Sequence, residues 1–205
     1  MQLSISDNID KVAKGLDKTA RKQIPFAVAQ TLTKLAYEAS QEEKKQAPRH
    51  IDRPTPYTVK GFRYRRANKR NLEALVFIQD RDYMRYTVHG GHAKPKRAAL
   101  VHPASNTKLN KYGNLPRRYV SKALANKAKF FSGIPQGMEG QDNAGIWQRY
   151  GGKRNPRIRM VAQWKGGRRY QAQFPFYEIA GQLVAGRANR IFNQQLERAL
   201  RTAKQ

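Results

Sequence analysis

Residues 157–200 read RIRMVAQWKGGRRYQAQFPFYEIAGQLVAGRANRIFNQQLERAL, and the spacing of their apolar side chains changes at Pro175. Before Pro175, apolar and polar residues alternate, which is typical of a half-buried β-strand. The alternating apolar residues, expected to face one way, are Ile158, Met160, Ala162 and Trp164. Residues 165–167, KGG, have the composition of a turn, and RRYQAQF follows them. Residues 157–174 are therefore predicted to form a β-hairpin.

After Pro175 a long helix is expected over roughly residues 176–203, because proline suits the first turn of a helix. Its apolar residues recur at three- and four-residue steps, and they are Ala180, Val184, Ala188, Ile191, Phe192, Leu196, Ala199 and Leu200. This stripe drifts around the helix axis, so the helix would bend around a sheet or contact two partners. The candidates for packing against a second subunit are Val184, Ile191 and Phe192.

A second long helix is predicted near the N-terminal end, beginning near Pro25 and ending at Pro48. One apolar stripe runs along it, made of Ile24, Val28, Leu32, Leu35, Ala36 and Ala39. Packing inside the chain explains the stripe, and so does additional contact with a neighbouring subunit through Val28, Leu32 and Leu35. A shorter helix is expected over about residues 7–16, with Asp7 as its N-cap.

The middle of the chain is predicted to contain strands and short helices. Residues 71–80 are rich in apolar and β-branched types and predict a strand, and residues 83–88 predict a second strand or extended segment. Short helices are expected after Gly90-Gly91, entered at Pro95, and over residues 115–131.

This order of elements predicts an α+β fold, with long N- and C-terminal helices packed on a central, mostly antiparallel β-sheet with extended basic loops. We expect one domain, residues 1–205. Its parts are the N-terminal helices (1–47), a basic β-rich middle with loops and short helices (48–174) and the C-terminal helix (175–205).

The positive charge is concentrated in the middle of the chain. The whole chain carries a net charge of +27, and residues 48–174 hold 28 basic and six acidic residues, a net +22. A compact body with this excess repels itself and is stabilised beside a polyanion or an acidic partner.

Aromatic residues are interspersed with cations in residues 49–70. Phe62 and Tyr64 would stack on nucleic-acid bases while the cations bind phosphate, or they would turn inward from a basic edge strand. The candidate contacts with a polyanion or an acidic partner are Arg63, Arg65, Arg66, Lys69, Arg70, Lys94, Lys96, Arg97, Arg117 and Arg118.

The residues needed for catalysis or metal binding do not form a convincing set. His89 and His92 flank Gly90-Gly91, which opposes helical geometry, and a zinc site would need a third ligand. We expect this stretch to be a positive-φ turn. Glu73, Asp80 and Asp82 would form at most a weak carboxylate cluster for a nuclease metal.

The chain has no phosphate-binding loop, no G-x-S-x-G and no H-E-x-x-H motif, so we predict no catalytic residue, no metal site, no cofactor and no enzymatic activity. It also has no cysteine, and therefore no thiolate metal site. No apolar run approaches the ~20 residues that span a bilayer, and residues 1–15 lack the apolar core of a secretory signal. We expect a protein made in the cytoplasm, with no membrane partner.

Five stretches of the chain occur in an order that resembles one group of proteins. They are IPFAVAQTLTKLAYEAS (24–40), KLNKYGNLPRR (108–118), FFSGIPQG (130–137), AGIWQRYGG (144–152) and YQAQFPFYEIA (170–180). Together they resemble the minor tail protein Z group of tailed bacteriophages, which is similar to other tail-completion and head–tail joining (neck) proteins. The resemblance covers roughly residues 20–205, and its motifs carry no catalytic signature.

The resemblance implies a structural virion protein, present in few copies at the head-proximal end of the tail and made in the host cytoplasm. It implies a homo-oligomeric ring around the DNA channel, with tail-tube, tail-terminator or connector proteins as neighbours and nonspecific contact with genomic DNA. The alternative from the composition is a stand-alone basic nucleic-acid-binding protein.

Overall fold

The computed structural model of the chain describes residues 2–6, 18–79, 82–95 and 99–203. The chain divides into two compact units, and the second is inserted in the first. Unit 1 consists of Met1–His89 and Ala172–Gln205, and unit 2 of Gly90–Gln171. The sequence predicts one domain with divisions after residues 47 and 174. The basic middle segment is instead shared between the two units.

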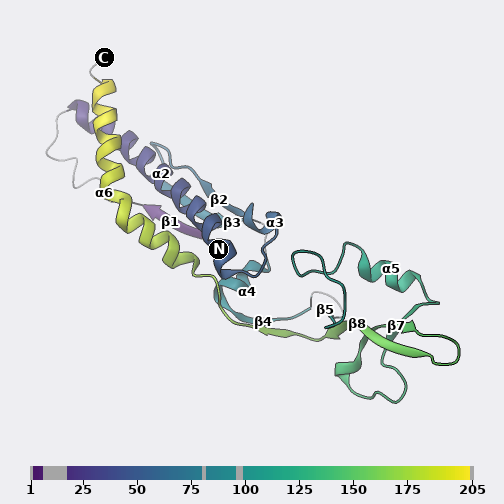
Figure 1. Ribbon diagram of the computed structural model, residues 1–205. Coiled ribbons are helices and arrows are strands. Elements are labelled where there is room, and N and C mark those ends of the chain that lie inside the picture. The colour runs from purple at the N-terminus through teal and green to yellow at the C-terminus, as the bar shows by residue number, and fades with distance from the viewer. Residues whose placement is uncertain (1, 7–17, 80–81, 96–98, 204–205) are drawn as a thin grey trace. The chain divides into compact units, whose positions relative to one another are not determined.

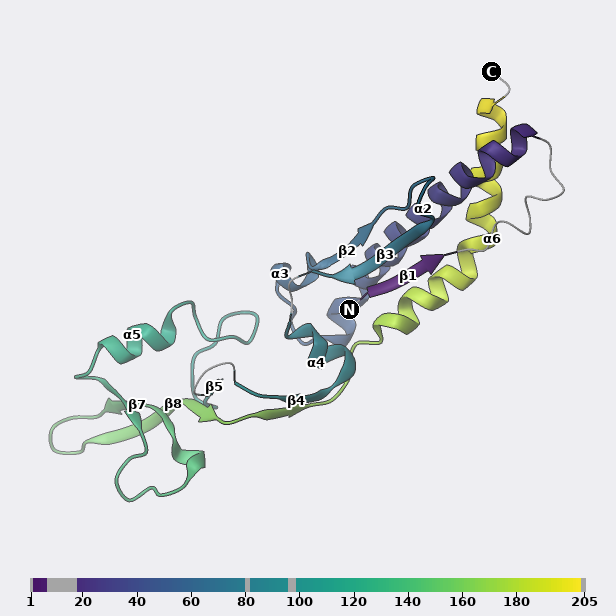
Figure 2. The same ribbon diagram turned by 180° about the vertical axis from the view of Figure 1, so that it is seen from behind.

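Unit 1 combines two long helices with a three-stranded antiparallel sheet in the order β1-β3-β2. Helix α2 covers one face of this sheet, and α6 runs alongside α2 (Figures 1 and 2). The elements of unit 1 are β1 (Gln2–Ser6), α2 (Lys18–His50), α3 (Pro56–Val59), β2 (Phe62–Arg65), β3 (Glu73–Ile78), α4 (Met84–His89) and α6 (Phe176–Ala203).

The core of unit 1 lies where α2 meets the sheet and α6. Alternate residues of β3, namely Ala74, Val76 and Ile78, belong to this core, as the two-residue period of a strand requires. The stripes predicted on both long helices supply its helical side: Ile24, Val28, Leu32, Leu35, Ala36, Ala39, Ala180 and Ile191 are buried. The start of α6 just after Pro175 is also as predicted.

Helix α2 is longer than predicted at both ends. It begins at Lys18, seven residues before Pro25, and ends at His50, two residues after Pro48. Each proline removes one helical hydrogen bond, and burial of Ile24 and Ala27 beside Pro25 helps to hold the helix together. At the other end, the Ile51 N–H donates to the Ala47 carbonyl (2.9 Å), so the last turn closes around Pro48. The short helix predicted over residues 7–16 lies outside the described residues.

The strand predicted over residues 83–88 is wrong, because Met84–His89 form helix α4. Its two buried residues, Met84 and Val88, are four apart, which places them on one side of a helix.

Two predicted short helices also differ from the structure. The one entered at Pro95 is not formed at its described positions: residues 94, 95 and 99 are irregular, Leu100 begins β5, and residues 96–98 lie outside the described part. The one over residues 115–131 is confined to Tyr119–Ala125. It ends at Asn126, whose side chain accepts a hydrogen bond from the Lys129 N–H (3.1 Å) and turns the chain into β6.

Unit 2 contains a four-stranded antiparallel sheet in the order β5-β8-β7-β6. Its buried cluster is small and contains Ala123, Ile146, Val161 and Ala162, with partly buried neighbours around it, and Trp147 is also buried in this unit. The elements of unit 2 are β4 (Gly91–Ala93), β5 (Leu100–Pro103), α5 (Tyr119–Ala125), β6 (Phe130–Gly133), η1 (Gln141–Asn143), β7 (Gly145–Tyr150), β8 (Arg157–Lys165) and β9 (Arg168–Tyr170).

The hairpin predicted over residues 157–174 is wrong, although both of its strands exist. Strand β8 pairs with β7 and β5, whereas β9 pairs with β4, where the chain enters and leaves unit 2. Gly167 permits the second pairing, since a Cβ there would lie 2.3 Å from Cε1 of His92. The hairpin that does form joins β7 to β8.

The clean alternation expected along β8 is interrupted by a β-bulge. The register with β7 shifts between Ile146 and Trp147, which pair with Ala162 and Met160 and leave Val161 as the extra residue. As a result, the consecutive residues Val161 and Ala162 are both buried.

The α+β class is confirmed, with long N- and C-terminal helices packed with antiparallel sheet. The described strands form three separate antiparallel sheets in place of one central sheet, counting the two-stranded β4–β9 ribbon.

One carboxyl group is buried in the core of unit 1 without a partner. Glu43 of α2 is fully buried, and among the described residues neither of its side-chain oxygens has a hydrogen-bond partner. Desolvation by burial raises the pKa of Glu43 from 4.5 to about 9, so the group is neutral in the folded protein at pH 7.

This burial predicts that the free energy of unfolding falls as pH rises. Between pH 4.5 and about 9 the folded state holds a proton that the unfolded state releases. The stabilisation is complete below pH 4.5 and declines above it, by at most ~1.4 kcal/mol per pH unit. Denaturant unfolding at a series of pH values measures this slope. We expect Glu43→Gln to remove most of it and Glu42→Gln, on the half-buried neighbour, to keep it. A slope that Glu43→Gln leaves unchanged would contradict the assignment.

Candidate polyanion-binding surface

The two units differ in charge balance. Unit 2 has 18 basic and two acidic residues, a net +16, whereas unit 1 has 23 basic and 12 acidic residues, a net +11. Unit 2 is the smaller of the two, so the positive charge is densest there. The acidic residues of unit 2, Glu139 and Asp142, lie close together in the sequence.

Unit 2 has almost no internal counter-charge. Among its described residues the one ion pair joins Lys165 to Asp142, with the Nζ and Oδ1 atoms 4.0 Å apart and the Asp142 side chain 94% exposed. An ion pair this long and this exposed contributes little. The remaining described cations of unit 2 have no carboxylate partner among the described residues, so only salt or an external anion can balance their charge.

Three residues near the end of the β7–β8 hairpin form a basic and aromatic surface on one face. Tyr150 pairs with Arg157 across the strands, and Gln148 pairs with Arg159. Residues that pair across two neighbouring strands lie on the same face of a ribbon, and so do residues two positions apart along one strand. The Arg159 Nε–H donates to Gln148 Oε1 (2.9 Å), and its guanidinium lies 5.4 Å from the centre of the Tyr150 ring.

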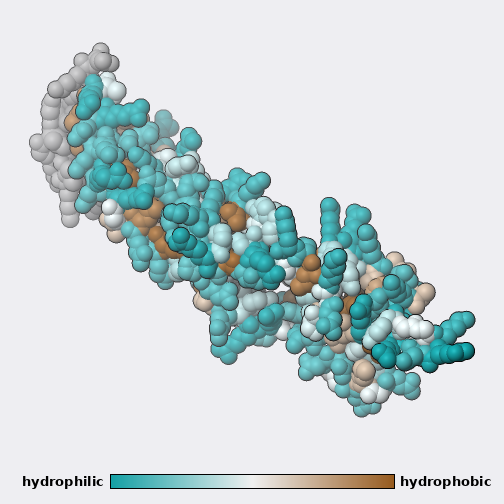
Figure 3. Space-filling model, in the orientation of Figure 1, coloured by the Kyte–Doolittle hydropathy of each residue, from teal (hydrophilic) through white to brown (hydrophobic). Residues whose placement is uncertain are grey.

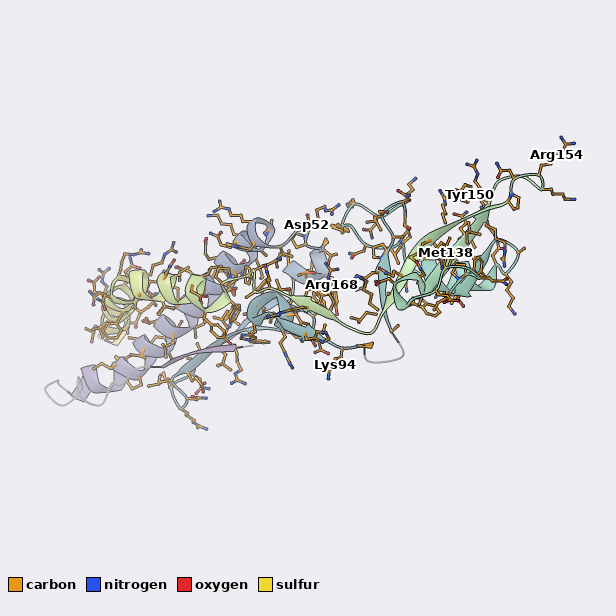
Figure 4. The ribbon with its side chains drawn as sticks, turned by 90° about the horizontal axis from the view of Figure 1, so that it is seen from below. Asp52, Lys94, Met138, Tyr150, Arg154 and Arg168 are labelled. Carbon is orange, nitrogen blue, oxygen red and sulfur yellow. The ribbon has the colours of Figure 1, made fainter. Side chains whose placement is uncertain are left out.

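The turn between these strands exposes two more cations to solvent. The Asn155 N–H donates to the Gly152 carbonyl (3.0 Å), which places Lys153 and Arg154 at the two central positions of a β-turn. Both are exposed, and Arg154 lies at the tip of the hairpin, beyond Tyr150 (Figure 4). Gly151 has φ 91°, and a Cβ there would lie 2.3 Å from the Asn155 carbonyl oxygen, so glycine is required.

Arg149, on the other face of the ribbon, has a structural role. Its guanidinium donates to the carbonyls of Lys127 (3.0 Å) and Phe130 (3.3 Å) and lies 4.6 Å from the centre of the Phe131 ring. These contacts connect β7 to the segment that leads into β6. We call Tyr150, Lys153, Arg154, Arg157 and Arg159 the hairpin end.

A second group of cations lies where the chain enters and leaves unit 2. Lys94 is exposed just after β4, and Arg168 of β9 places its guanidinium 3.1 Å from Nδ1 of His102 (Figure 4). Burial first, and then the charges of Arg168 and Lys165, lower the pKa of His102. A neutral His102 can accept the Arg168 hydrogen bond. The predicted contacts Lys96 and Arg97 lie outside the described residues.

Arg117 and Arg118 are exposed at the start of α5. Arg118 has a positive φ of 60°, and its carbonyl accepts hydrogen bonds from the Lys122 N–H (2.9 Å) and the Ser121 hydroxyl (3.0 Å). Its backbone therefore begins the helix while its side chain remains in solvent.

The five predicted contacts in unit 1 lie on β2 and the loop that follows it. Arg63 and Arg65 are exposed, whereas Phe62 is buried and Tyr64 is half-buried against the core, 5.5 Å from the ring of Tyr37. The inward orientation of the aromatics on a basic edge strand is thus confirmed. These rings are not available to stack on bases.

The β2–β3 loop is ordered by its own hydrogen bonds. The Asn68 side chain accepts from the Arg70 and Asn71 N–H groups, and the Ala67 N–H donates to the Thr33 hydroxyl of α2 (3.1 Å). Arg66, Lys69 and Arg70 are exposed on this loop. Among the described residues, no ion pair involves any of the five cations.

The positive φ predicted for Gly90 and Gly91 is confirmed, but the His-Gly-Gly-His stretch joins α4 directly to β4 and is not a separate turn. His89 ends α4, Gly90 and Gly91 have φ values of 68° and 111°, and His92 lies in β4. Within the described ranges, no three His, Asp or Glu residues are grouped to hold a metal ion. Glu73 begins β3 and Asp82 follows its far end, so β3 separates them, and Asp80 lies outside the described residues.

No family model, curated protein or solved structure matches the chain. A search of the described helices finds none with the length and apolar character of a membrane span.

The cations of the hairpin end were not among the sequence-predicted contacts. The sequence signal for them is YGGKRNPRIR (150–159), in which Gly-Gly and Asn-Pro bracket two cations. From the sequence, its last part predicts the start of a strand, and no contact is predicted in the turn before it. The structure brings both parts together in one hairpin.

The basic loop of unit 1 yields a direct test of the predicted contacts. Replacing Arg65, Arg66, Lys69 and Arg70 by Ser should weaken binding to heparin or duplex DNA roughly tenfold, because phosphate or sulfate contacts are lost. Thermal stability should change little, since the four side chains are exposed. Arg187→Ser, which removes a cation paired with Glu38 (2.7 Å), serves as the control. A sharp loss of stability with binding intact would show that the loop has been misinterpreted.

Proposed function

We propose that the chain is a structural virion protein of a tailed phage, which completes the head-proximal end of the tail or joins head and tail. It does so as a homo-oligomeric ring around the DNA channel. The observation that carries the proposal is the charge of unit 2, with 18 basic and two acidic residues. An ordered unit with so little counter-charge of its own is stabilised by an external polyanion. The resemblance in residues 20–205 supports the location in a tail.

In this proposal the two units have different roles. Unit 2 presents cations to genomic DNA or to acidic neighbours, namely the tail-tube, tail-terminator or connector proteins. Unit 1 supplies the contacts between subunits. A ring multiplies the charge of unit 2 by the number of subunits, so salt, DNA or an acidic wall that balances this charge favours its closure. The role is one of attachment and requires no catalytic residue and no cofactor.

Of the six residues predicted to pack against a neighbouring subunit, four are buried in the core of unit 1. Val28, Leu32, Leu35 and Ile191 are each at most 4% exposed, because they form the core of their own chain. They cannot reach a neighbouring subunit while that core is closed. Val184 and Phe192 of α6 are partly buried and keep some surface for a neighbour. Figure 3 shows apolar patches along the part of unit 1 that contains the long helices.

The alternative is a stand-alone nucleic-acid-binding protein, which the exposed Tyr150 among arginines of the hairpin end favours. The oligomeric state of the purified protein distinguishes the tail protein from the stand-alone nucleic-acid-binding protein. We expect annular oligomers of the purified protein in negative-stain images and a matching mass in native mass spectrometry. Monomers at every concentration, and in the presence of purified tails, would contradict the ring and favour the alternative.

Phe192→Asp tests the role of α6 in assembly. It places a charge in the partly buried stripe, and we expect it to lower the free energy of unfolding by roughly 2–4 kcal/mol and to abolish the oligomer. Asn193→Asp adds the same charge at an exposed neighbouring position and should preserve both. Unchanged stability and unchanged assembly in Phe192→Asp would exclude this face of α6 from packing. Light scattering and denaturant unfolding provide the two measurements.

A further inference from the structure

The hairpin end of unit 2 is a basic surface on a two-stranded ribbon. Lys153 and Arg154 lie at the turn, and Arg157 and Arg159 follow along one face, with Tyr150 beside them. Neighbouring strands are about 4.8 Å apart. A two-stranded β-ribbon therefore fits the major groove of duplex DNA, which is about 12 Å wide.

The hairpin contains no carboxylate that would reduce the positive electrostatic potential at the hairpin end. Residues 149–159 contain five cations and no acidic residue. Asp142, one of the two acidic residues of unit 2, lies beside the other end of β8, where its backbone carbonyl accepts a hydrogen bond from the Gln163 side chain (2.7 Å). Gln163 is six residues from Arg157, or about 20 Å along an extended strand.

The tip is also ordered before any ligand binds. Its turn is closed by the Gly152–Asn155 backbone hydrogen bond, and Gly151 adopts a conformation that permits close contact with Asn155. Arg159 is held by Gln148 and by the Tyr150 ring. Binding therefore costs less conformational entropy than it would for a flexible basic tail.

We propose that the hairpin end is the element of unit 2 that binds duplex DNA. Lys153 and Arg154 contact phosphates from the tip, and Arg157 and Arg159 continue the contact along the ribbon. The inference rests on the proposed function, in which an external polyanion stabilises unit 2, and it names that polyanion and the residues that bind it.

The composition of the hairpin end favours duplex DNA over single strands. Binding of single strands uses several aromatic rings on which successive bases stack. The hairpin end has one aromatic residue, Tyr150, and Arg159 already contacts its ring. Cations at the tip of a narrow ribbon instead suit phosphates on the two sides of a groove.

A charge-matched pair of variants of the full chain tests the proposal. Lys153→Ser with Arg154→Ser removes two cations from the tip. The control, Lys108→Ser with Lys111→Ser, removes two cations from another exposed, ordered loop of unit 2. In that loop Lys111 lies over the ring of Tyr112 at 5.2 Å, as Arg159 lies over Tyr150 at the hairpin end. Binding of a labelled short duplex is measured by fluorescence anisotropy at several salt concentrations.

We expect the tip variant to lose about tenfold or more in affinity and to reduce the slope of log K against log salt by about 1.8, because two phosphate contacts disappear. The control should lose less than about threefold and keep its slope. Equal losses in both variants would overturn the inference. A tip variant that binds polyglutamate more weakly but duplex DNA normally would also overturn it, in favour of an acidic protein.

Crosslinking provides a second measurement that does not depend on lost affinity. The chain has no cysteine, so one introduced thiol carries a photo-crosslinker uniquely. Gly152 and Gly166 lie near opposite ends of β8, and a Cβ at either position meets nothing within 4 Å. We expect Gly152→Cys to crosslink to the duplex at least about fivefold more than Gly166→Cys. An equal or reversed ratio would overturn the inference.

The outcome separates this inference from the proposed function. If rings form and bind DNA while the tip and control variants behave alike, the hairpin inference fails and the tail function stands. If the protein remains monomeric but loses DNA binding on substitution of the tip, the ring function fails and the hairpin inference stands.

Discussion

The main constraint on this structure is electrostatic repulsion within unit 2. This unit has 18 basic residues and only two acidic residues to neutralise them. Two like charges 10 Å apart in water repel by about 0.4 kcal/mol before salt screening. Summed over many neighbouring pairs, that repulsion is comparable with the ~5–15 kcal/mol net stability of an ordinary domain. Among the described residues, the buried cluster that opposes it has four members, of which two are alanines, and Trp147 is also buried in this unit.

Unit 2 reduces this repulsion by keeping its cations at the surface and placing several of them over aromatic rings. Arg149 lies over Phe131, Arg168 over Tyr170, and Lys111 over Tyr112. Each contact contributes roughly 0.5–1 kcal/mol at an exposed site. These contacts support the fold without removing charge, so the field that attracts a polyanion remains. Unit 1 carries a smaller net charge, with 12 acidic residues against 23 basic ones, and has a larger core to oppose the repulsion.

The long helices were predictable because their signals are local and repeated. Pro175 and the stripe beyond it locate α6, and Leu32 and Leu35 fall in the core as their spacing predicts. The pairing of strands was not predictable, because it depends on contacts between distant residues. The KGG turn after β8 has the composition of a hairpin turn, yet β9 pairs with β4, and Gly167 permits the close approach of His92. Met84 and Val88 belong to a helix too short to show a clear period. The hairpin end was missed because its cations come from a turn and a strand that the sequence presents as separate features.

The account depends on one claim: repulsion between its own cations lowers the stability of unit 2, and an external anion raises it. Hydrogen exchange monitored by mass spectrometry on the full chain tests it most directly, because peptides from β7 and β8 can be followed separately from those of α2 and α6. We predict that raising salt, or adding duplex DNA at low salt, slows exchange in β7 and β8 by tenfold or more, about 1.4 kcal/mol, and changes α2 and α6 much less. Exchange in β7 and β8 that is indifferent to both additions, or that accelerates, would contradict the account.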